Sequence, residues 1–494
     1  MTHFSWLVDG SIVGLYLLAT MVAGVMVRKY VVKVEHFLVA GREMNVYLGI
    51  ASLAATEFGI VTCMYTAQNG YDKGFAGAVP GICQAIAMFA IGLTGFCIKP
   101  LRESGAMTIP ELFAKRFGTR IRWASGVVIV LGGLLNMGVF LRTGGEFLVL
   151  VCGFDVKYLE LTMTVLLVGV AVYTILGGML SVLVTDFLQF VVMSAGLIIV
   201  TILILRHVGW DKLVATVETH HGAGGFNPFV NPTMGWPYVL FNLFLNTAAT
   251  LTWQTTVARV LAAKDSATGR RVYVGTAFFF VCRFLIPGLW GIAALAVLGP
   301  AVAGETSLQA MPRFLSTFVP VGIMGILVAA MLAADMSTDS SYMLTWGSVI
   351  YNDILAPFRK TRWSERKGLF WNRTIIALIG VFLLFYGLWY PLKGNLWDYL
   401  TLTGTIYLSS MSVLLIACCY WKRANNWGAA AAIVCGAVVP VGYLILEQVP
   451  ATTPLTRQIG PYYSGLATYL LVAAAMVAGS LLKPRGQAAR PPSN

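Results

Sequence analysis

The residues best suited to chemistry in this chain are gathered at 333–341, AADMSTDSS, within an apolar run over residues 319–354. Two carboxylates and four hydroxyls occur there in seven residues. On a helix, the small and hydroxyl residues of this segment share one face, namely Ala334, Ser337, Thr338, Ser341 and Thr345. Such short oxygen ligands suit a hard monovalent or divalent cation. The alternative is that the hydroxyls only bond carbonyls of their own helix and help helices to pack, but the adjacent acids favour a cation site.

Asp335 and Asp339 form an acidic stripe beside that face. A charge at bilayer depth costs about 2.5–3.5 kcal/mol, so each acid must face protein or water and have a partner. Arg283 lies midway along an apolar span at 272–298, at a similar depth, and needs an anion. We therefore expect a structural ion pair between Arg283 and Asp335 or Asp339.

The composition is that of a polytopic membrane protein. Of 494 residues, 58% are hydrophobic and only 11% are charged, and the mean hydropathy is +0.77. Apolar runs of roughly 20 residues recur along the chain, so we expect an all-α fold with about 13 transmembrane helices. With the N-terminus outside and the C-terminus cytoplasmic, most of the 34 Lys and Arg residues fall in cytoplasmic loops; the net charge of +13 then reflects topology and not a nucleic-acid partner. The eight cysteines show no CxxC spacing, so neither a metal site nor a disulfide framework is indicated.

Two spans are interrupted by polar and flexible residues. The span at 46–69 contains AATEFG at 54–59, with Glu57 near mid-membrane, and the span at 237–262 carries Asn246 and a run of threonines. A helix that unwinds at such depth is tolerated where its free carbonyls line a cavity or bind an ion. Each interrupted span opens a group of five spans, and an odd number makes the second group enter from the opposite side, as in an inverted repeat. The expected divisions are an accessory helix and cytoplasmic loop (1–45), the first repeat (46–206), an extracellular loop (207–236), the second repeat (237–420), and C-terminal accessory helices with a short tail (421–494).

Other polar residues within spans are candidates for binding a solute or an ion. Arg142 and Glu146 stand four residues apart, where they either neutralise each other or leave a guanidinium free for a carboxylate. Asp186 lies at the cytoplasmic end of its span, where a helix cap is the alternative to an ion ligand. The residues that we expect to line a solute pocket are Glu57, Thr62, Gln84, Arg142, Asn246, Trp253 and Gln254. Such side chains suit sugars, amino acids and carboxylates alike.

Over residues 5–480 the chain resembles the sodium:solute symporter family, which includes sodium-coupled carriers of glucose, galactose, proline, pantothenate and sialic acid. The resemblance rests on motifs in a fixed order: FLVAGR at 37–42, ASL at 51–53, PELFAKRFG at 110–118, GGMLSVLVTDFLQ at 177–189, RVLAA at 259–263 and AADMST at 333–338. It implies a LeuT-type core of two inverted five-helix repeats, with the solute held mid-membrane between two broken helices.

The resemblance also implies ion sites. By position, one sodium ion would be bound by the backbone carbonyls of Ala55, Phe58 and Ala334 and the hydroxyls of Ser337 and Thr338. Some members bind a further sodium ion through an acid and later serines, to which Asp186, Ser340 and Ser341 correspond here. The chain departs from the family at Glu57, where relatives often carry Asp or Asn. Sialic acid carriers place an arginine in the helix that corresponds to the span of Arg142.

The expected function is secondary active symport, in which entry of one or two sodium ions drives uptake of a small organic solute by alternating access. No HExxH, P-loop, GxSxG or paired Cys/His motif indicates an enzyme. A proton-coupled carrier is the alternative, because the carboxylates of Glu57, Asp186, Asp335 and Asp339 offer a relay. A transporter-like membrane sensor is a more remote alternative. We expect a monomer as the functional unit, in the cell (inner or plasma) membrane, with the lipid bilayer and the solute as its partners.

Overall fold

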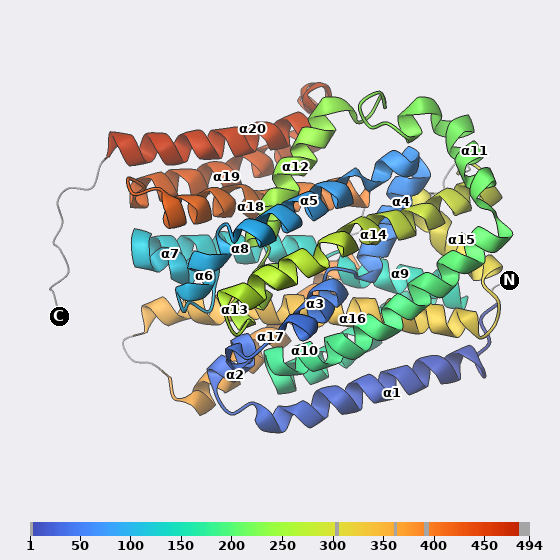
Figure 1. Ribbon diagram of the computed structural model, residues 1–494, viewed down its shortest axis with the longest axis horizontal. Coiled ribbons are helices and arrows are strands. Elements are labelled where there is room, and N and C mark those ends of the chain that lie inside the picture. Colours follow the sequence, from blue (N-terminus) through green and yellow to red (C-terminus); the bar gives the residue numbers. More distant parts are fainter. Residues whose placement is uncertain (1–2, 302–305, 360–362, 390–394, 484–494) are drawn as a thin grey trace.

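The protein is described by a computed structural model that covers residues 3–301, 306–359, 363–389 and 395–483. Over these residues the fold is all-α. The β-type backbone pairing among them is one isolated bridge between Met44 and Ala263. The helices run roughly along the long axis of the molecule (Figure 1). They are α1 (Asp9–Val27), α2 (Val34–Val39), α3 (Val46–Thr56), α4 (Ile60–Lys73), α5 (Val79–Thr94), α6 (Ile98–Glu103), α7 (Ile109–Phe117), α8 (Thr119–Met137), α9 (Phe140–Cys152), α10 (Leu159–His207), α11 (Trp210–His221), α12 (Gly235–Thr252), α13 (Gln254–Ala262), α14 (Ser266–Leu298), α15 (Ala310–Phe318), α16 (Ile323–Val349), α17 (Glu365–Trp389), α18 (Leu396–Tyr420), α19 (Asn426–Gln448) and α20 (Thr453–Leu482).

In the described ranges, ten helical stretches are long and apolar enough to cross a membrane. Two of them turn back on themselves. The stretch Ile60–Thr94 contains both α4 and α5, and α10 reverses at Gly178, whose φ of 54° lies in the region that favours glycine. With these reversals and the broken helix α12–α13, the architecture accommodates the expected thirteen crossings. Because thirteen is an odd number of crossings, the first and last helices begin and end on opposite sides. In Figure 1, α1 begins at the right-hand end and α20 ends at the left-hand end.

The first expected interruption is present between α3 and α4. Helix α3 ends at Thr56, and α4 begins at Ile60 after Gly59, which is in an extended conformation. The intervening residues, Glu57 and Phe58, are buried. The break therefore places the first turn of α4 and the acidic side chain of Glu57 inside the protein, away from lipid.

The second interruption lies at Trp253, between α12 and α13. Trp253 has φ −63° and ψ 123°, an extended conformation that ends α12 at Thr252 and starts α13 at Gln254. Its indole N–H donates to the hydroxyl of Tyr342 in α16 at 3.1 Å. Both predicted breaks are thus confirmed, and both face the same central helix.

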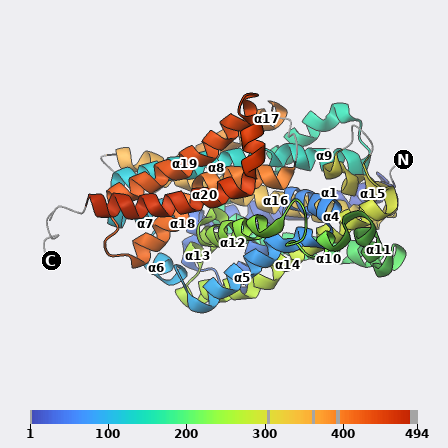
Figure 2. The same ribbon diagram turned by 90° about the horizontal axis from the view of Figure 1, so that it is seen from above.

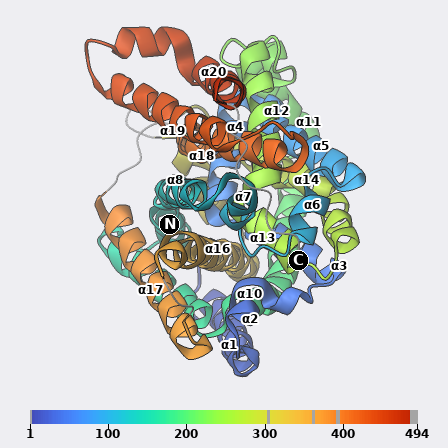
Figure 3. The same ribbon diagram turned by 90° about the vertical axis from the view of Figure 1, so that its left-hand side faces the viewer.

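Helix α16 is the core of the bundle. It is buried along nearly its whole length, and it packs against α1, α3, α10 and α17. In the end-on view it lies inside the bundle, with α1 and α17 at one margin and α19 at the other (Figure 3). Helices α19 and α20 pack against each other on the outside of α18 (Figure 2). The polar segment 333–341 is therefore enclosed by protein on all sides.

Helices α4 and α14 approach each other through glycines. A Cβ atom added at Gly291 in α14 would lie 1.9 Å from the carbonyl oxygen of Ala67, and one at Gly70 would lie 2.0 Å from that of Gly288. Only residues without a side chain fit such a contact. This contact fixes the position of α14, and with it Arg283, against the second half of the first broken helix.

Candidate solute and sodium sites

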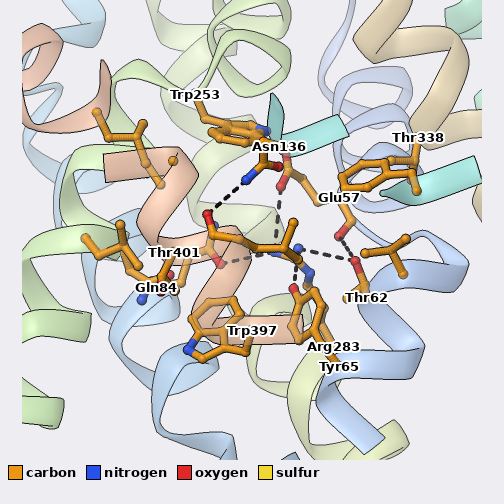
Figure 4. A pocket seen from close by; sticks show the side chains of 18 of the residues that line it. Glu57, Thr62, Tyr65, Gln84, Asn136, Trp253, Arg283, Thr338, Trp397 and Thr401 are labelled. Atoms are coloured by element: carbon orange, nitrogen blue, oxygen red, sulfur yellow. Dashed lines mark hydrogen bonds and ion pairs between the residues drawn. The ribbon is translucent and has the colours of Figure 1, made fainter. Parts of the chain in front are cut away.

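A central cavity lies where the two broken helices meet α5, α8, α14, α16 and α18. Its empty volume is about 670 Å³, part of it open to solvent. Figure 4 shows Arg283 in the middle of this cavity, with Glu57 and Thr62 to one side and Trp397 and Tyr65 below. The residues lining it are Glu57, Val61, Thr62, Tyr65, Gln84, Asn136, Phe140, Leu245, Asn246, Ala249, Trp253, Arg283, Thr338, Tyr342, Trp397, Leu400, Thr401, Gly404 and Leu408.

Arg283 of α14 is held mainly by uncharged groups. Its guanidinium donates to the Gln84 amide oxygen at 3.2 Å and to the Tyr65 hydroxyl at 2.9 Å, with a longer contact of 3.4 Å to Thr62. The rings of Phe280 and Phe284 each lie 5.6 Å from its central carbon. These contacts fix the plane of the guanidinium without neutralising it.

The nearest anion to Arg283 is Glu57, in the break between α3 and α4. Their closest atoms, Nη1 and Oε2, are 3.6 Å apart, which makes an ion pair without a direct hydrogen bond. The other carboxylate oxygen of Glu57 accepts from the hydroxyls of Thr255 at 2.7 Å and Thr256 at 3.1 Å, both in α13. Glu57 therefore ties the first broken helix to the second, and only loosely to Arg283.

The predicted ion pair of Arg283 with Asp335 or Asp339 is wrong. Among the described residues, the salt bridge of Arg283 is to Glu57, and neither aspartate has one. Asp335 instead accepts a hydrogen bond from the backbone N–H of Ile60, the first residue of α4. The first turn of a helix carries a partial positive charge. The start of α4 therefore takes the place of the arginine that we expected as the partner of Asp335. Asp339 lies one turn further on, and its Oδ1 has no hydrogen-bond partner in the described structure.

Of the residues expected to bind the first sodium ion, Thr338 joins the Ala334 carbonyl to the end of α3 at the same break. The Thr338 hydroxyl is 2.9 Å from the carbonyl oxygen of Thr56, at the end of α3, and 3.0 Å from that of Ala334. A Cβ added at Gly59 would lie 2.9 Å from the Thr338 oxygen, so the glycine lets α16 approach the unwound segment. Ser337 lies beside them, 3.5 Å from the Thr56 hydroxyl, but its own hydroxyl donates to Asp186. Carbonyl oxygens of α3 and α16 thus meet at the Thr338 hydroxyl; the α3 carbonyl there belongs to Thr56, whereas the expected carbonyls were those of Ala55 and Phe58.

Two of the residues expected to bind a further sodium ion, Asp186 and Ser341, contact an arginine that we did not assign to this site. Asp186 of α10 and Arg259 of α13 form a fully buried salt bridge of 3.0 Å. The same guanidinium donates to the Ser341 hydroxyl at 2.7 Å and to the Thr56 hydroxyl at 2.5 Å. Ser340 does not join this cluster, since its hydroxyl donates to a carbonyl of its own helix. The positive charge beside Asp186 therefore comes from a side chain.

Of the residues expected to line the solute pocket, Glu57, Thr62, Gln84, Asn246 and Trp253 do so. Gln254 is buried but is not among the lining residues. Arg142 does not line the cavity either, because it forms a 3.0 Å salt bridge with Glu146 in its own helix and reaches the carbonyl of Gly387. Sequence reasoning missed Tyr65, Asn136, Tyr342 and Trp397, which carry no signal that distinguishes them from packing residues. Arg259 and Ser52 lie within the family motifs RVLAA and ASL, so their buried contacts with Asp186 could have been predicted.

Comparison with known proteins agrees with this geometry. The model of the sodium:solute symporter family matches residues 37–436. Sodium/glucose cotransporter 4 of Danio rerio is 28% identical over 458 residues, which cover 84% of this chain and 68% of that protein. The osmoregulated proline transporter OpuE of Bacillus subtilis is 25% identical, with coverage of 91% and 90%.

Among solved structures, a sodium-coupled sialic acid symporter in a substrate-bound, outward-open state superposes with a TM-score of 0.80 at 20% identity, covering 97% of this chain and 99% of that one. Mhp1, a nucleobase-cation symporter, is more distant, with a TM-score of 0.56 at 15% identity. These similarities confirm the expected all-α membrane fold of the LeuT type. The chain belongs to the sodium:solute symporter family and is a multi-pass, sodium-coupled carrier of small solutes, not an enzyme.

Proposed function

We propose that this carrier binds one sodium ion at the break between α3 and α4, and one organic solute in the central cavity beside it. The observation that carries the proposal is the position of Thr338. Its hydroxyl contacts the carbonyl oxygen of Thr56 at the break, and its side chain also lines the cavity. A sodium ion at the break would therefore sit against the solute site itself.

The ligands that we propose for this ion are the backbone carbonyls of Ala55, Phe58 and Ala334 and the hydroxyls of Ser337 and Thr338. Both halves of the set come from elements that must move relative to each other in alternating access: the broken helix and α16. An ion that binds both would favour the arrangement in which they are close. Binding of the solute next to the sodium ion then gives the fully loaded carrier, which moves both across the membrane.

For the second ion we propose that Arg259 takes its place in this conformation. The Asp186 carboxylate already has a cation at 3.0 Å and hydroxyl donors from Ser52 and Ser337. A sodium ion bound to Asp186 and Ser341 would have to displace the guanidinium. The stoichiometry that follows is one sodium ion per solute.

The proposed orientation has the N-terminus outside and the C-terminus cytoplasmic, in the cell (inner or plasma) membrane. It is supported by the Lys and Arg residues in α6 and α7 and in the turns that flank α2, since Lys and Arg are enriched in cytoplasmic loops. Helices α6 and α7 lie toward the left-hand end in Figure 1. We propose a monomer as the functional unit.

The sodium site can be tested without knowing the solute. Purified protein is heated in increasing NaCl with KCl balancing ionic strength, because an ion that binds only the folded state raises the melting temperature. Thr338→Val keeps the shape of the side chain and removes one oxygen, and we expect it to raise the half-effective sodium concentration at least several-fold. The matched control is Thr345→Val, whose hydroxyl bonds only carbonyls of its own helix, Ser341 at 2.9 Å and Tyr342 at 3.3 Å. Equal sodium responses in wild type and both variants would show that the site lies elsewhere.

A further inference from the structure

Arg283 differs from the buried Arg259 and from the partly buried Arg122 and Arg142. Arg259, Arg122 and Arg142 each contact a carboxylate at 2.8–3.0 Å. Arg283 is also buried, at 9% exposure, yet its carboxylate lies at 3.6 Å and its Nε has no hydrogen-bond partner in the part of the chain that the structure describes. A buried charge without a full partner is costly, and here it faces a cavity.

Several of the other polar groups on the wall donate to protein carbonyls. The amide nitrogen of Asn246 donates to the Asn242 carbonyl at 2.8 Å, and that of Asn136 donates to the Leu400 carbonyl at 2.9 Å. The hydroxyl of Thr401 donates to a carbonyl of its own helix at 3.0 Å. The rest of the wall is mostly aromatic or aliphatic, including Phe140, Leu245, Trp253, Trp397, Leu400 and Leu408. A sugar would bring a hydroxyl on almost every carbon to a wall that is mostly apolar and whose polar groups are partly bonded to protein.

The charges around the cavity also select for the charge of the solute. Glu57 and Arg283 are the charged residues among those that line it, and their charges cancel. A sodium ion at the break adds one positive charge next to Glu57. Among the lining residues and this ion alone, a monoanion balances the added positive charge; the buried carboxylates of Asp335 and Asp339 in α16 lie behind the cavity wall and are not among the lining residues. A zwitterion would also need a site for its ammonium group, but Glu57 is occupied by Thr255 and Thr256 on one oxygen and faces Arg283 with the other.

We propose that the solute is a small organic monocarboxylate with a mainly apolar body, and that Arg283 binds its carboxylate. The planar fork of a guanidinium matches a carboxylate in two parallel hydrogen bonds. Gln84 and Tyr65 hold the fork in the cavity, and Trp397 and Phe140 are among the side chains that would surround the apolar body. This assignment rests on the proposed function, and it moves the carboxylate partner from Arg142, where we looked for it in the sequence, to Arg283.

The test is a thermal-shift comparison of purified protein with matched acids and amides, in NaCl and in KCl. The probes are propionate, lactate and benzoate, their uncharged amides, glucose as a neutral sugar, and proline as a zwitterion. We expect at least one acid to raise the melting temperature in sodium only, and its amide to bind at least about tenfold more weakly, because a hydrogen bond to a charged group contributes about that factor or more. Arg283→Gln should weaken binding of that acid by about 10- to 100-fold, whereas Arg142→Gln, the matched arginine outside the cavity, should leave it unchanged.

Sodium-dependent stabilisation by glucose or proline, with none of the acids active, would overturn the monocarboxylate assignment while leaving sodium-coupled binding in place. Stabilisation by an acid equally in NaCl and KCl would overturn the proposed function instead. Binding of the acid to Arg283→Gln with unchanged affinity would remove Arg283 from the site. If that variant does not fold, the acid and amide pairs on the unchanged protein still decide the charge of the solute.

Discussion

Removing the charge of Asp186 should destabilise the protein more than removing the whole Asp186–Arg259 pair. Both side chains are fully buried, and the pair joins α10 to α13. The same carboxylate accepts from Ser52 of α3 at 2.5 Å and from Ser337 of α16 at 2.5 Å. Four helices therefore meet at one carboxylate.

The loss of stability that we expect for Asp186→Asn follows from the complete burial of both side chains. Asp186→Asn keeps the shape of the side chain but leaves the Arg259 guanidinium without a counter-charge in a dry environment. Breaking a buried pair in this way costs about 3–5 kcal/mol, whereas replacing both partners with uncharged groups is often close to neutral. The double variant Asp186→Asn/Arg259→Gln should therefore recover most of the loss, which is a coupling of several kcal/mol between the two positions.

The assay is equilibrium unfolding of wild type, both single variants and the double variant in the same detergent, with the sodium titration repeated on each. Arg259→Gln adds a second readout, since it frees Asp186 and Ser341 to bind a cation. We expect that variant to gain a further sodium-dependent rise in melting temperature that the double variant lacks. If the double variant is no more stable than Asp186→Asn, or if Asp186→Asn is as stable as wild type, the two residues do not act as a pair and the reasoning fails.

Three further perturbations test other contacts. Gly291→Ala should destabilise the protein by about 1–3 kcal/mol or prevent folding, because its Cβ would lie 1.9 Å from the Ala67 carbonyl, whereas Gly169→Ala, with no atom within 4 Å, should melt like wild type. Asp9→Ala should lower stability by about 1–2 kcal/mol, more than Asp9→Asn, since its carboxylate accepts from the backbone N–H groups of Gly322 and Gly325, each at 2.7 Å, at the start of α16; chemical unfolding measures both. Asp339→Asn should leave the half-effective sodium concentration unchanged, because the residue lies outside the proposed ligand set, and loss of the sodium response would instead place it among the ligands.

Much of the framework was predictable from the sequence. Polar residues that recur within an apolar run mark both broken helices, because a lipid-facing helix would not tolerate them. The periodicity of 333–341 placed Ala334 and Thr338 on one face, and that face meets the break at Thr56. Such predictions succeed because they concern the order of residues along one helix, which sequence spacing fixes.

The partners of the buried charges were not predictable in the same way. Arg283 and the aspartates of α16 have similar depths, but depth does not say which way a side chain points around its own helix. The partner of Asp335 is the start of α4, a group that exists only because the helix breaks before Ile60. Arg142 was considered for the solute because the family resemblance implies an arginine in this helix, whereas Glu146, four residues away, neutralises it locally. These assignments depend on how separate helices are rotated against one another.

The arrangement around Glu57 gives a physical reason for coupling between ion and solute. Glu57 lies within the break, so a sodium ion bound to the carbonyls of Ala55 and Phe58 would lie close to its carboxylate. That ion would weaken the attraction between Glu57 and Arg283, which are only loosely paired at 3.6 Å. A guanidinium released in this way binds an incoming carboxylate more strongly, and by thermodynamic reciprocity the bound carboxylate raises the affinity for sodium by the same factor. Replacing Glu57 with Gln should therefore reduce the dependence of solute binding on sodium, even where binding itself persists.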